Sequence, residues 1–434
     1  MEINVGSDKQ KTSVENMNEQ GALDDYEEGQ TPKTDMSFNK MMNRHRENKY
    51  DRKKKDKEGR GKKAMKKIEK RDESLPILPR HLILEILSRL PVKSLVRFKS
   101  VSKSWLTLFT DPFFVKMHLN RSHKRKKLVF PCKGSEFNYG MRLVVFSSDN
   151  IDEPRKIHVD SLLQFPAAES SSIRILGSCD GLILCLTDDR FLHMVNPSTR
   201  EFQTLSESPF NTSFPSYGFG YDGSTDDYKI VEISSSPSDE NTASVYTSKT
   251  NVWRRIQDIP YQVMSIEPAT LLNGALHWLT KDKSKIVSLN LADEKFQYFL
   301  LPDFETRTQD YFFSAFKGCP CVCLTRLDDP ICYTESWVMK EYGKRESWTS
   351  IRHHFFLQNR VKPLDYSNND EILFFRHAYF LYVFNLEKNT HRLIKIPYDA
   401  QFRSLQFDEA ETFLETIVST GGIALNRRLN DASV

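Results

Sequence analysis

The sequence predicts a disordered, charged N-terminal tail at residues 1–73, a small all-α segment at 74–120, an all-β domain at 121–420 and a flexible C-terminus at 421–434. Three observations lead to this division. The tail contains almost no large apolar side chains, the next stretch has apolar residues at helical spacing between prolines, and the remainder consists of short strand-like runs separated by turn residues. A chain of 434 residues with 39% hydrophobic residues can bury a sizeable core.

Charge is distributed unevenly along the chain. Residues 44–71 hold 15 Lys/Arg and 5 Asp/Glu, a balance of +10, whereas residues 1–43 hold 4 Lys/Arg and 9 Asp/Glu, a balance of −5. Residues 72–434 therefore contribute −1 to the overall charge of +4. Because phosphate-backbone binding needs basic residues concentrated on the folded surface, we expect no nucleic-acid partner. The tail itself has too few apolar residues to offset the conformational entropy lost on ordering.

Two basic clusters lie within the tail, DRKKKDK at 51–57 and KKAMKK at 62–67. They resemble the two halves of a nuclear import signal, and a solvated charge run is the alternative interpretation. The candidate import residues are Lys53, Lys54, Lys55, Lys62 and Lys63.

The sequence contains no uninterrupted run of about 18 apolar residues and no apolar leader at its N-terminus. We therefore expect a protein of the nucleus and/or cytoplasm with no membrane partner. In such a reducing compartment cysteines are expected to be buried thiols rather than disulfides. The seven are Cys132, Cys179, Cys185, Cys319, Cys321, Cys323 and Cys332.

The stretch from Leu78 to Trp105 predicts short helices. The first begins near Pro79 and stops before Pro91, because the residue preceding a proline is disfavoured in helical conformation. A second follows, and a third runs from a Ser102 cap to Asp111-Pro112. The first helix has apolar residues at the spacing of one wide face: Leu82, Ile83, Ile86, Leu87 and Leu90.

Three helices of this length carry more large apolar side chains than so small a bundle can enclose. Two outcomes are open. The surplus apolar face packs on the downstream domain of the same chain, or it binds a partner protein.

The helical stretch resembles an F-box. The matching residues are LP at 78–79, Leu82, EILSRLP at 85–91, KSL at 93–95, RF at 97–98 and SKSW at 102–105, and His81 stands where the family usually has an acidic residue. In that family the motif binds a Skp-type adaptor, which joins it to a cullin scaffold and a ubiquitin-conjugating enzyme. The adaptor contacts that the resemblance implies are Leu78, Pro79, Leu82, Ile86, Leu87, Leu90 and Leu95.

The all-β domain has an internal repeat. Asn196, Asn290 and Asn385 occupy equivalent places in hairpin-like segments at intervals of 94 and 95 residues, and Trp253 and Trp348 are also 95 apart. Halving these intervals gives a unit of about 47 residues with two hairpins, or four strands. Such units are typical of β-propeller blades, and the counted units predict about six.

A segment at residues 412–418, TFLETIV, is expected to close the ring of blades. The runs GLILCL, NPSTREF, GFGYD, YKIV, VYTSKTNVWR and GALHWL resemble the F-box-associated domain of plant F-box proteins, a kelch-like family. The resemblance implies that this domain binds a client protein.

We find no convincing catalytic, cofactor or metal site in the sequence. GSCDG at 177–181 lacks the order Gly-x-Ser-x-Gly of a hydrolase. CPCVC at 319–323 would place three thiols on one face of a strand without a fourth ligand, and the adjacent His353 and His354 would point to opposite faces of a strand. We therefore expect no catalytic residue, no cofactor and no metal.

The expected function is that of the substrate-recognition subunit of a Skp-cullin-F-box ubiquitin ligase, with the F-box on the adaptor and the propeller on an unidentified client. A non-ligase protein that uses the adaptor for stability or localisation is the alternative. A propeller enzyme related to kelch-type oxidases is disfavoured, because the sequence offers no cofactor site.

Overall fold

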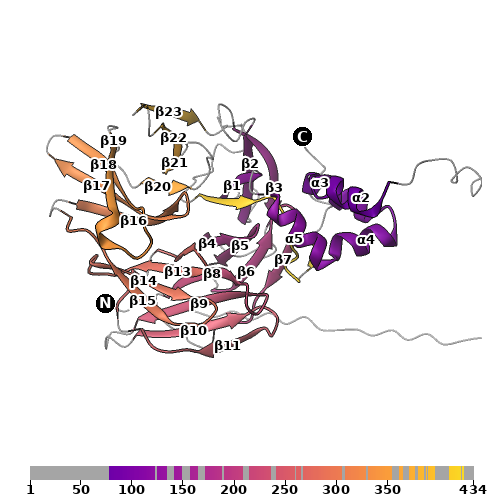
Figure 1. Ribbon diagram of the computed structural model, residues 1–434, viewed down its shortest axis with the longest axis horizontal. Coiled ribbons are helices and arrows are strands. Elements are labelled where there is room, and N and C mark those ends of the chain that lie inside the picture. Colours follow the sequence, from indigo (N-terminus) through magenta and orange to yellow (C-terminus); the bar gives the residue numbers. More distant parts are fainter. Residues whose placement is uncertain are drawn as a thin grey trace, which may run out of the picture. The chain divides into compact units, whose positions relative to one another are not determined.

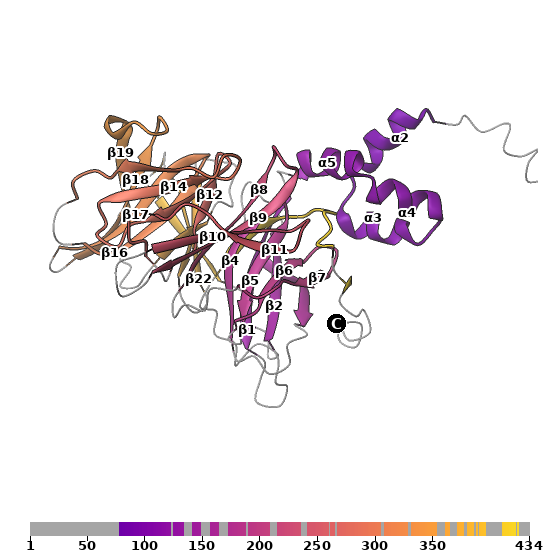
Figure 2. The ribbon, with the colours of Figure 1, turned by 90° about the horizontal axis from the view of Figure 1, so that it is seen from below.

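The computed structural model is shown in Figures 1 and 2. It describes residues 78–122, 125–133, 141–148, 157–164, 172–187, 190–208, 215–235, 241–259, 261–264, 267–304, 308–328, 331–353, 361–364, 371–376, 380–385, 388, 390–395, 410–421 and 423–424. The helices and sheets belong to one compact unit, Pro79–Val434. The import candidates Lys53, Lys54, Lys55, Lys62 and Lys63 lie outside the described residues, so the import signal stays a prediction.

The helical segment contains four helices among its described residues, not the predicted three. They are α2 (Arg80–Leu87), α3 (Val92–Lys99), α4 (Lys103–Thr110) and α5 (Pro112–Asn120). The predicted Ser102 cap is confirmed, since its Oγ accepts a hydrogen bond from the Trp105 N–H at 3.3 Å. Asp111 does more than end α4: its carboxylate accepts from the Phe113 and Phe114 N–H groups at 2.9 and 3.2 Å, and Pro112 begins α5.

The core of the four helices includes a side chain from the far end of the sequence. Leu87, Val92, Leu95, Phe109 and Phe114 are buried together, and the rings of Phe109 and Phe114 lie 5.3 Å apart. Ile417, only 2% exposed, belongs to the same cluster. The helical core is therefore completed by a residue that follows the all-β domain.

The remaining described residues form six antiparallel sheets. The first combines β24 (Glu411–Leu414), β1 (Lys126–Lys133), β2 (Met141–Ser148) and β3 (Ile157–Gln164), and the second combines β25 (Ile423–Ala424), β7 (Glu201–Thr204), β6 (Leu192–Asn196), β5 (Leu182–Thr187) and β4 (Ile173–Cys179). The third runs β8 (Ser216–Asp222), β9 (Asp227–Ser235), β10 (Asn241–Thr247), β11 (Val252–Arg255), and the fourth β12 (Thr270–Leu272), β13 (Ala275–Leu279), β14 (Lys285–Asn290), β15 (Phe296–Leu300). The fifth runs β16 (Thr308–Phe316), β17 (Cys319–Asp328), β18 (Ile331–Met339), β19 (Trp348–His353), and the sixth β20 (Val361–Leu364), β21 (Glu371–Arg376), β22 (Phe380–Asn385), β23 (Thr390–Lys395). The predicted β-propeller of four-stranded antiparallel blades is confirmed.

The sequence repeat has a local structural cause. Asn196, Asn290 and Asn385 each end the third strand of a sheet, and the side-chain Oδ1 of each accepts a hydrogen bond from a backbone N–H two or three residues later. This Asx turn fixes the reversal into the fourth strand without help from the rest of the fold. Trp253 and Trp348 also correspond, because both indole N–H groups donate to a backbone carbonyl, of Ser206 at 2.9 Å and Leu300 at 3.3 Å.

The ring is closed by the C-terminal strand, as predicted. β24 pairs with β1 in antiparallel register from Lys126↔Leu414 to Val129↔Glu411, and Figure 1 shows the yellow strand beside β1. The pairing joins the two ends of the domain within one sheet, which leaves no free edge at that place. The prediction that residues 421–434 form a flexible C-terminus is wrong at Ile423–Ala424, because β25 pairs with Phe202 and Glu201 of β7.

Candidate functional site

One face of α2 leaves large apolar side chains exposed. Leu82 is 40% exposed and Ile86, one helical turn later, is 51% exposed; we call these two residues the α2 face. Ile83 and Leu84 are partly buried against the helical core, and Leu87 is buried in it. The apolar stripe predicted from the sequence is thus divided between an outward and an inward side. The outward side is available to a partner.

The other predicted adaptor contacts occupy different environments. Leu78 is 51% exposed, and Pro79 is exposed at the N-cap of α2. Leu90 is partly buried. Leu87 and Leu95 are 4% and 0% exposed, which corrects the prediction that they contact a partner: a side chain enclosed by its own chain has no surface to offer, and both instead stabilise the helical core.

Polar contacts fix α2 against α5. Glu85 accepts hydrogen bonds from Arg89, with a shortest N–O distance of 2.5 Å, and from Arg121 at the end of α5. Arg121 also donates to the Glu85 carbonyl at 3.0 Å and to the Ser88 hydroxyl. Hydrogen bonds from Arg89 and then Arg121 lower the pKa of Glu85, so the carboxylate stays ionised and keeps both arginines in place.

A buried histidine contacts the backbone just past the end of α2. The Leu90 carbonyl, just past the helix, lies 3.1 Å from His118 Nε2 and accepts from Arg125 Nη1 at 2.6 Å. His118 has no exposed surface, and burial, followed by the positive charge of Arg125, lowers its pKa to about 4. The imidazole is therefore neutral at pH 7, and its Nε2–H can donate to the Leu90 carbonyl.

We expect this histidine to make stability depend on pH. The pKa of His118 is about 4 in the fold and 6.5 as the ordinary value, so the unfolded chain binds more protons between these limits. The contribution of His118 is complete above pH 6.5 and is lost as the pH falls toward 4, by on the order of 3 kcal/mol. His277, whose pKa burial also lowers to about 4, adds a similar term.

Urea unfolding of the wild type and of His118→Gln between pH 7 and pH 5 measures this effect. Glutamine keeps a donor for the Leu90 carbonyl but does not titrate, so the free energy of unfolding of the variant should fall less steeply with pH. His277→Gln is a matched variant in the propeller and should reduce the slope independently. Equal slopes for wild type and His118→Gln would contradict the assignment.

The last helix, α5, packs on the propeller. Val115 and Leu119 lie against the buried cluster that contains Leu176 and Val418, and Lys116 pairs with Asp226 of the β8–β9 turn at 2.7 Å. Part of the surplus apolar surface is therefore covered by the downstream domain, while the α2 face is not. Of the two outcomes that the sequence left open, packing on the downstream domain occurs at α5, and the α2 face stays exposed. Helix α5 was not among the helices predicted from the sequence, although Asp-Pro at 111–112 is a helix-start signal.

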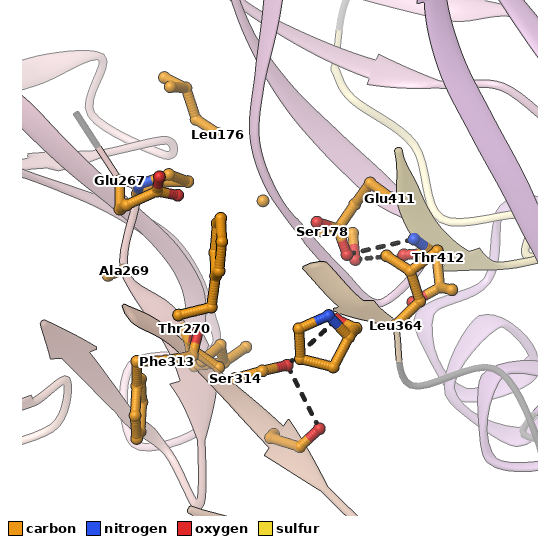
Figure 3. A pocket seen from close by; sticks show the side chains of 16 residues that line it. Leu176, Ser178, Glu267, Ala269, Thr270, Phe313, Ser314, Leu364, Glu411 and Thr412 are labelled. Carbon is orange, nitrogen blue, oxygen red and sulfur yellow. Dashed lines mark hydrogen bonds between the residues drawn. The ribbon is translucent and has the colours of Figure 1, made fainter. Parts of the chain in front are cut away.

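A small cavity lies between the first strands of several blades. It has a volume of about 210 Å³, and Figure 3 shows residues of β4, β12, β16, β20 and β24 around it. Ser178 donates to the Thr412 carbonyl at 2.6 Å, and Ser314 lies 3.4 Å from the Pro363 carbonyl. These hydroxyls therefore join strands of different blades. The volume is below the roughly 300–1,000 Å³ of most small-molecule sites, and the contacts across the cavity serve packing.

The cysteines lie in the propeller core. Cys179, Cys185, Cys321 and Cys323 are buried free thiols, as predicted, and the side chains of Cys132 and Cys332 lie outside the described part. Cys321 and Cys323 share one face of β17 with partly buried Cys319, against Val338 and Phe384. The hydrogen-bonded thiol of Cys323, followed by burial, raises the pKa of Cys321. Within the described residues, no group of three or more His, Cys, Asp or Glu side chains is placed to hold a metal ion.

No helix in the described ranges has the length and apolar character needed to cross a bilayer. The side chains of His353, at the end of β19, and of His354 lie outside the described residues.

Comparison with known proteins identifies both parts of the chain. Residues 75–116 match the F-box domain model, and residues 135–420 match the model of the F-box associated beta propeller domain. Three relatives from Arabidopsis thaliana are similar over most of their length. F-box protein CPR1 is 25% identical over 311 residues (63% of this chain, 72% of the relative). F-box/kelch-repeat protein At3g23880 is 28% identical over 341 residues (70% and 87%), and F-box protein At3g07870 is 28% identical over 309 residues (63% and 72%).

The propeller match alone covers more than half of the chain. The F-box match includes α2 with its exposed face, α3 and α4, and ends within α5. The chain therefore belongs to the plant F-box proteins that carry an F-box-associated β-propeller domain.

Proposed function

We propose that this chain is the substrate-recognition subunit of a Skp-cullin-F-box ubiquitin ligase. The observation that carries the proposal is the α2 face, two large apolar side chains left exposed beside the buried helical core in a segment that matches the F-box domain. The Skp-type adaptor binds this face, and the adaptor links the chain to the cullin scaffold. The propeller binds the client protein.

The physical basis of adaptor binding is apolar burial. A Leu or Ile side chain that becomes fully buried contributes about 1.5–3 kcal/mol, and Leu82 and Ile86 have between two fifths and half of their surface still to bury. Leu78 and Pro79, exposed just before the helix, extend the contact in this proposal. The contacts of Glu85 with Arg89 and Arg121 hold α2 in position beforehand, which lowers the entropy cost of association.

The propeller acts by holding the client near the conjugating enzyme. Such tethering raises the effective concentration of the acceptor lysine, and the chain itself supplies no reacting group. The packing of α5 and Ile417 joins the F-box to the propeller through buried contacts rather than through a linker. Such packing suits a substrate receptor, because it fixes the position of a client bound to the propeller relative to the adaptor bound to the helices.

Placing a charge on the α2 face should abolish adaptor binding. Ile86→Asp would bury an unpaired carboxylate at the interface, and we expect adaptor affinity to fall by more than about a hundredfold. Leu393→Asp is the matched control, because Leu393 of β23 is also 51% exposed but lies in the propeller. Capture of a purified Skp-type adaptor by each full-length variant is the measurement.

Equal capture by both variants would overturn the assignment of the α2 face. If the adaptor is captured normally by the wild type, the half-life of captured client proteins in cells then separates the two remaining functions. A half-life that shortens with wild type and not with Ile86→Asp supports the ligase. A half-life that responds to neither supports a non-ligase F-box protein.

A further inference from the structure

A second cavity lies between α3 and the propeller. Its volume is about 440 Å³, and its lining comes from α3 and the residue before it, from β1, β2, β3 and β24, from the turn between β6 and β7, and from the segment after β24. The volume falls within the range of small-molecule sites, roughly 300–1,000 Å³. The residues important here are Lys93, Arg97, Lys127, Ser198, Thr199 and Arg200.

The cavity lining carries uncompensated positive charge. Lys127 is neutralised locally, since its Nζ lies 2.7 Å from Asp160 and 3.6 Å from Glu415. Lys93 and Arg97 follow one another at i and i+4 on α3, a helix without an acidic residue, and neither pairs with a described carboxylate. Like charges at this spacing repel each other. With Arg200 and Lys127 they make four cations in the lining against the two carboxylates of Asp160 and Glu415, a balance of +2 that an anion would offset.

Two hydroxyls of the same lining lack hydrogen-bond partners. Ser198 Oγ and Thr199 Oγ1 are buried and make no hydrogen bond in the described structure. Their backbone N–H groups are already satisfied by Asn196 Oδ1, at 2.8 and 3.2 Å. Buried hydroxyls without a partner are unfavourable, and an oxyanion in the cavity could accept from each hydroxyl after rotation of its side chain toward the cavity.

The repeat provides an internal comparison for this turn. After Asn290, the equivalent of Asn196, the left-handed residue is Glu294 (φ 55°); after Asn196 it is Arg200 (φ 61°). Glu294 binds Lys229 at 2.9 Å and also pairs with Arg254. In this blade the turn therefore places the Glu294 carboxylate in an ion-pair network. In the other blade it places a charge of opposite sign beside a cavity without a described counter-ion.

We propose that this cavity binds a small solute that carries two or more phosphate groups. Arginine guanidinium groups and hydroxyls are the donors that suit phosphate oxygens, and a lining with a charge balance of +2 favours a ligand with more than one negative charge. A bound phosphate ligand would touch both α3 and the β6–β7 turn, so it would stabilise the F-box against the propeller. This inference does not depend on ubiquitin-ligase activity.

Tripolyphosphate is the probe for the full-length chain, with sulfate at equal ionic strength as the reference. Calorimetric titration should show binding of tripolyphosphate, and the melting temperature should rise with it but not with sulfate. Arg97→Gln and Arg200→Gln should each weaken binding about tenfold or more. Lys281→Gln removes an equal charge from an exposed site on the propeller and should leave the affinity unchanged.

Thr199→Val gives a second, independent readout. Because the Thr199 hydroxyl has no partner in the free protein, the variant should keep or exceed the wild-type melting temperature without ligand, yet bind tripolyphosphate more weakly. Affinities for tripolyphosphate that are the same for wild type, Arg97→Gln and Arg200→Gln would overturn the site. Binding of a phosphorylated peptide but not of tripolyphosphate would overturn the choice of a small solute.

Discussion

Replacing Ile417 with alanine should loosen the F-box helices, although Ile417 lies at the opposite end of the folded chain. Its side chain is 2% exposed and packs in the same cluster as Leu87, Leu95 and Phe109. Truncation of a buried isoleucine leaves a cavity and typically costs about 2–5 kcal/mol. Because Leu87 belongs to α2, the loss should also reach the neighbouring α2 face and weaken capture of the adaptor.

The matched control is Ile259→Ala. Ile259 is 3% exposed and packs in a separate cluster of the propeller, with Val245 and Trp278. Both variants should lower the free energy of unfolding in urea by a similar amount, but only Ile417→Ala should reduce adaptor capture at temperatures where both remain folded. Parallel losses of adaptor binding in the two variants would show that Ile417 has no special connection to the F-box.

The second large effect is expected at Gly181, where alanine should disrupt closure of the propeller ring. Gly181 has φ +85° in the two-residue turn between β4 and β5, and a Cβ there would lie 2.5 Å from the Leu414 carbonyl and against the Thr416 side chain. The left-handed backbone alone costs a non-glycine residue about 1–2 kcal/mol, and the overlap with backbone adds about 1–3 kcal/mol. The closing strand would have to move.

Gly274→Ala isolates the effect of closure from the effect of backbone conformation. Gly274 occupies the equivalent turn between β12 and β13 with φ +73°, but an added Cβ there meets nothing within 4 Å. Thermal unfolding should therefore show a modest loss for Gly274→Ala and a loss greater by several degrees for Gly181→Ala. Equal melting temperatures would mean that the contact with Leu414 and Thr416 is not important for closure.

Both predictions concern the closing segment, residues Glu411–Thr420. Its first part pairs with β1, and Asn196 Nδ2 then donates to the carbonyls of Thr416 and Val418 at 3.1 and 2.6 Å. Between these two carbonyls Ile417 enters the helical core. The closing segment thus stabilises ring and F-box together. A chain that begins at residue 121 would lack the helical residues against which Ile417 packs. Such a truncation would therefore disturb the propeller and would not test client binding separately from adaptor binding.

Local patterns in the sequence determined much of this protein. Ser102 caps α4 with its own hydroxyl, and Asn196, Asn290 and Asn385 bind backbone groups two or three residues away, so these features depend on neighbours in the chain alone. Their spacing indicated the period of the blades, and short apolar runs between turn residues predicted the strands. Asp111 could also have been read in this way, since its capping of α5 is equally local.

Only the tertiary structure decided which side chains are available for function. Leu82 and Leu87 are the same residue type and lie on one predicted helical stripe, yet Leu82 is 40% exposed and Leu87 is 4% exposed. Their burial differs because it depends on which side chains of α3, α4, α5 and Ile417 pack against α2. The cavity beside Arg200 likewise combines α3 with a turn far along the chain. Contacts between distant segments depend on how the whole chain packs, so a local pattern in the sequence does not predict them.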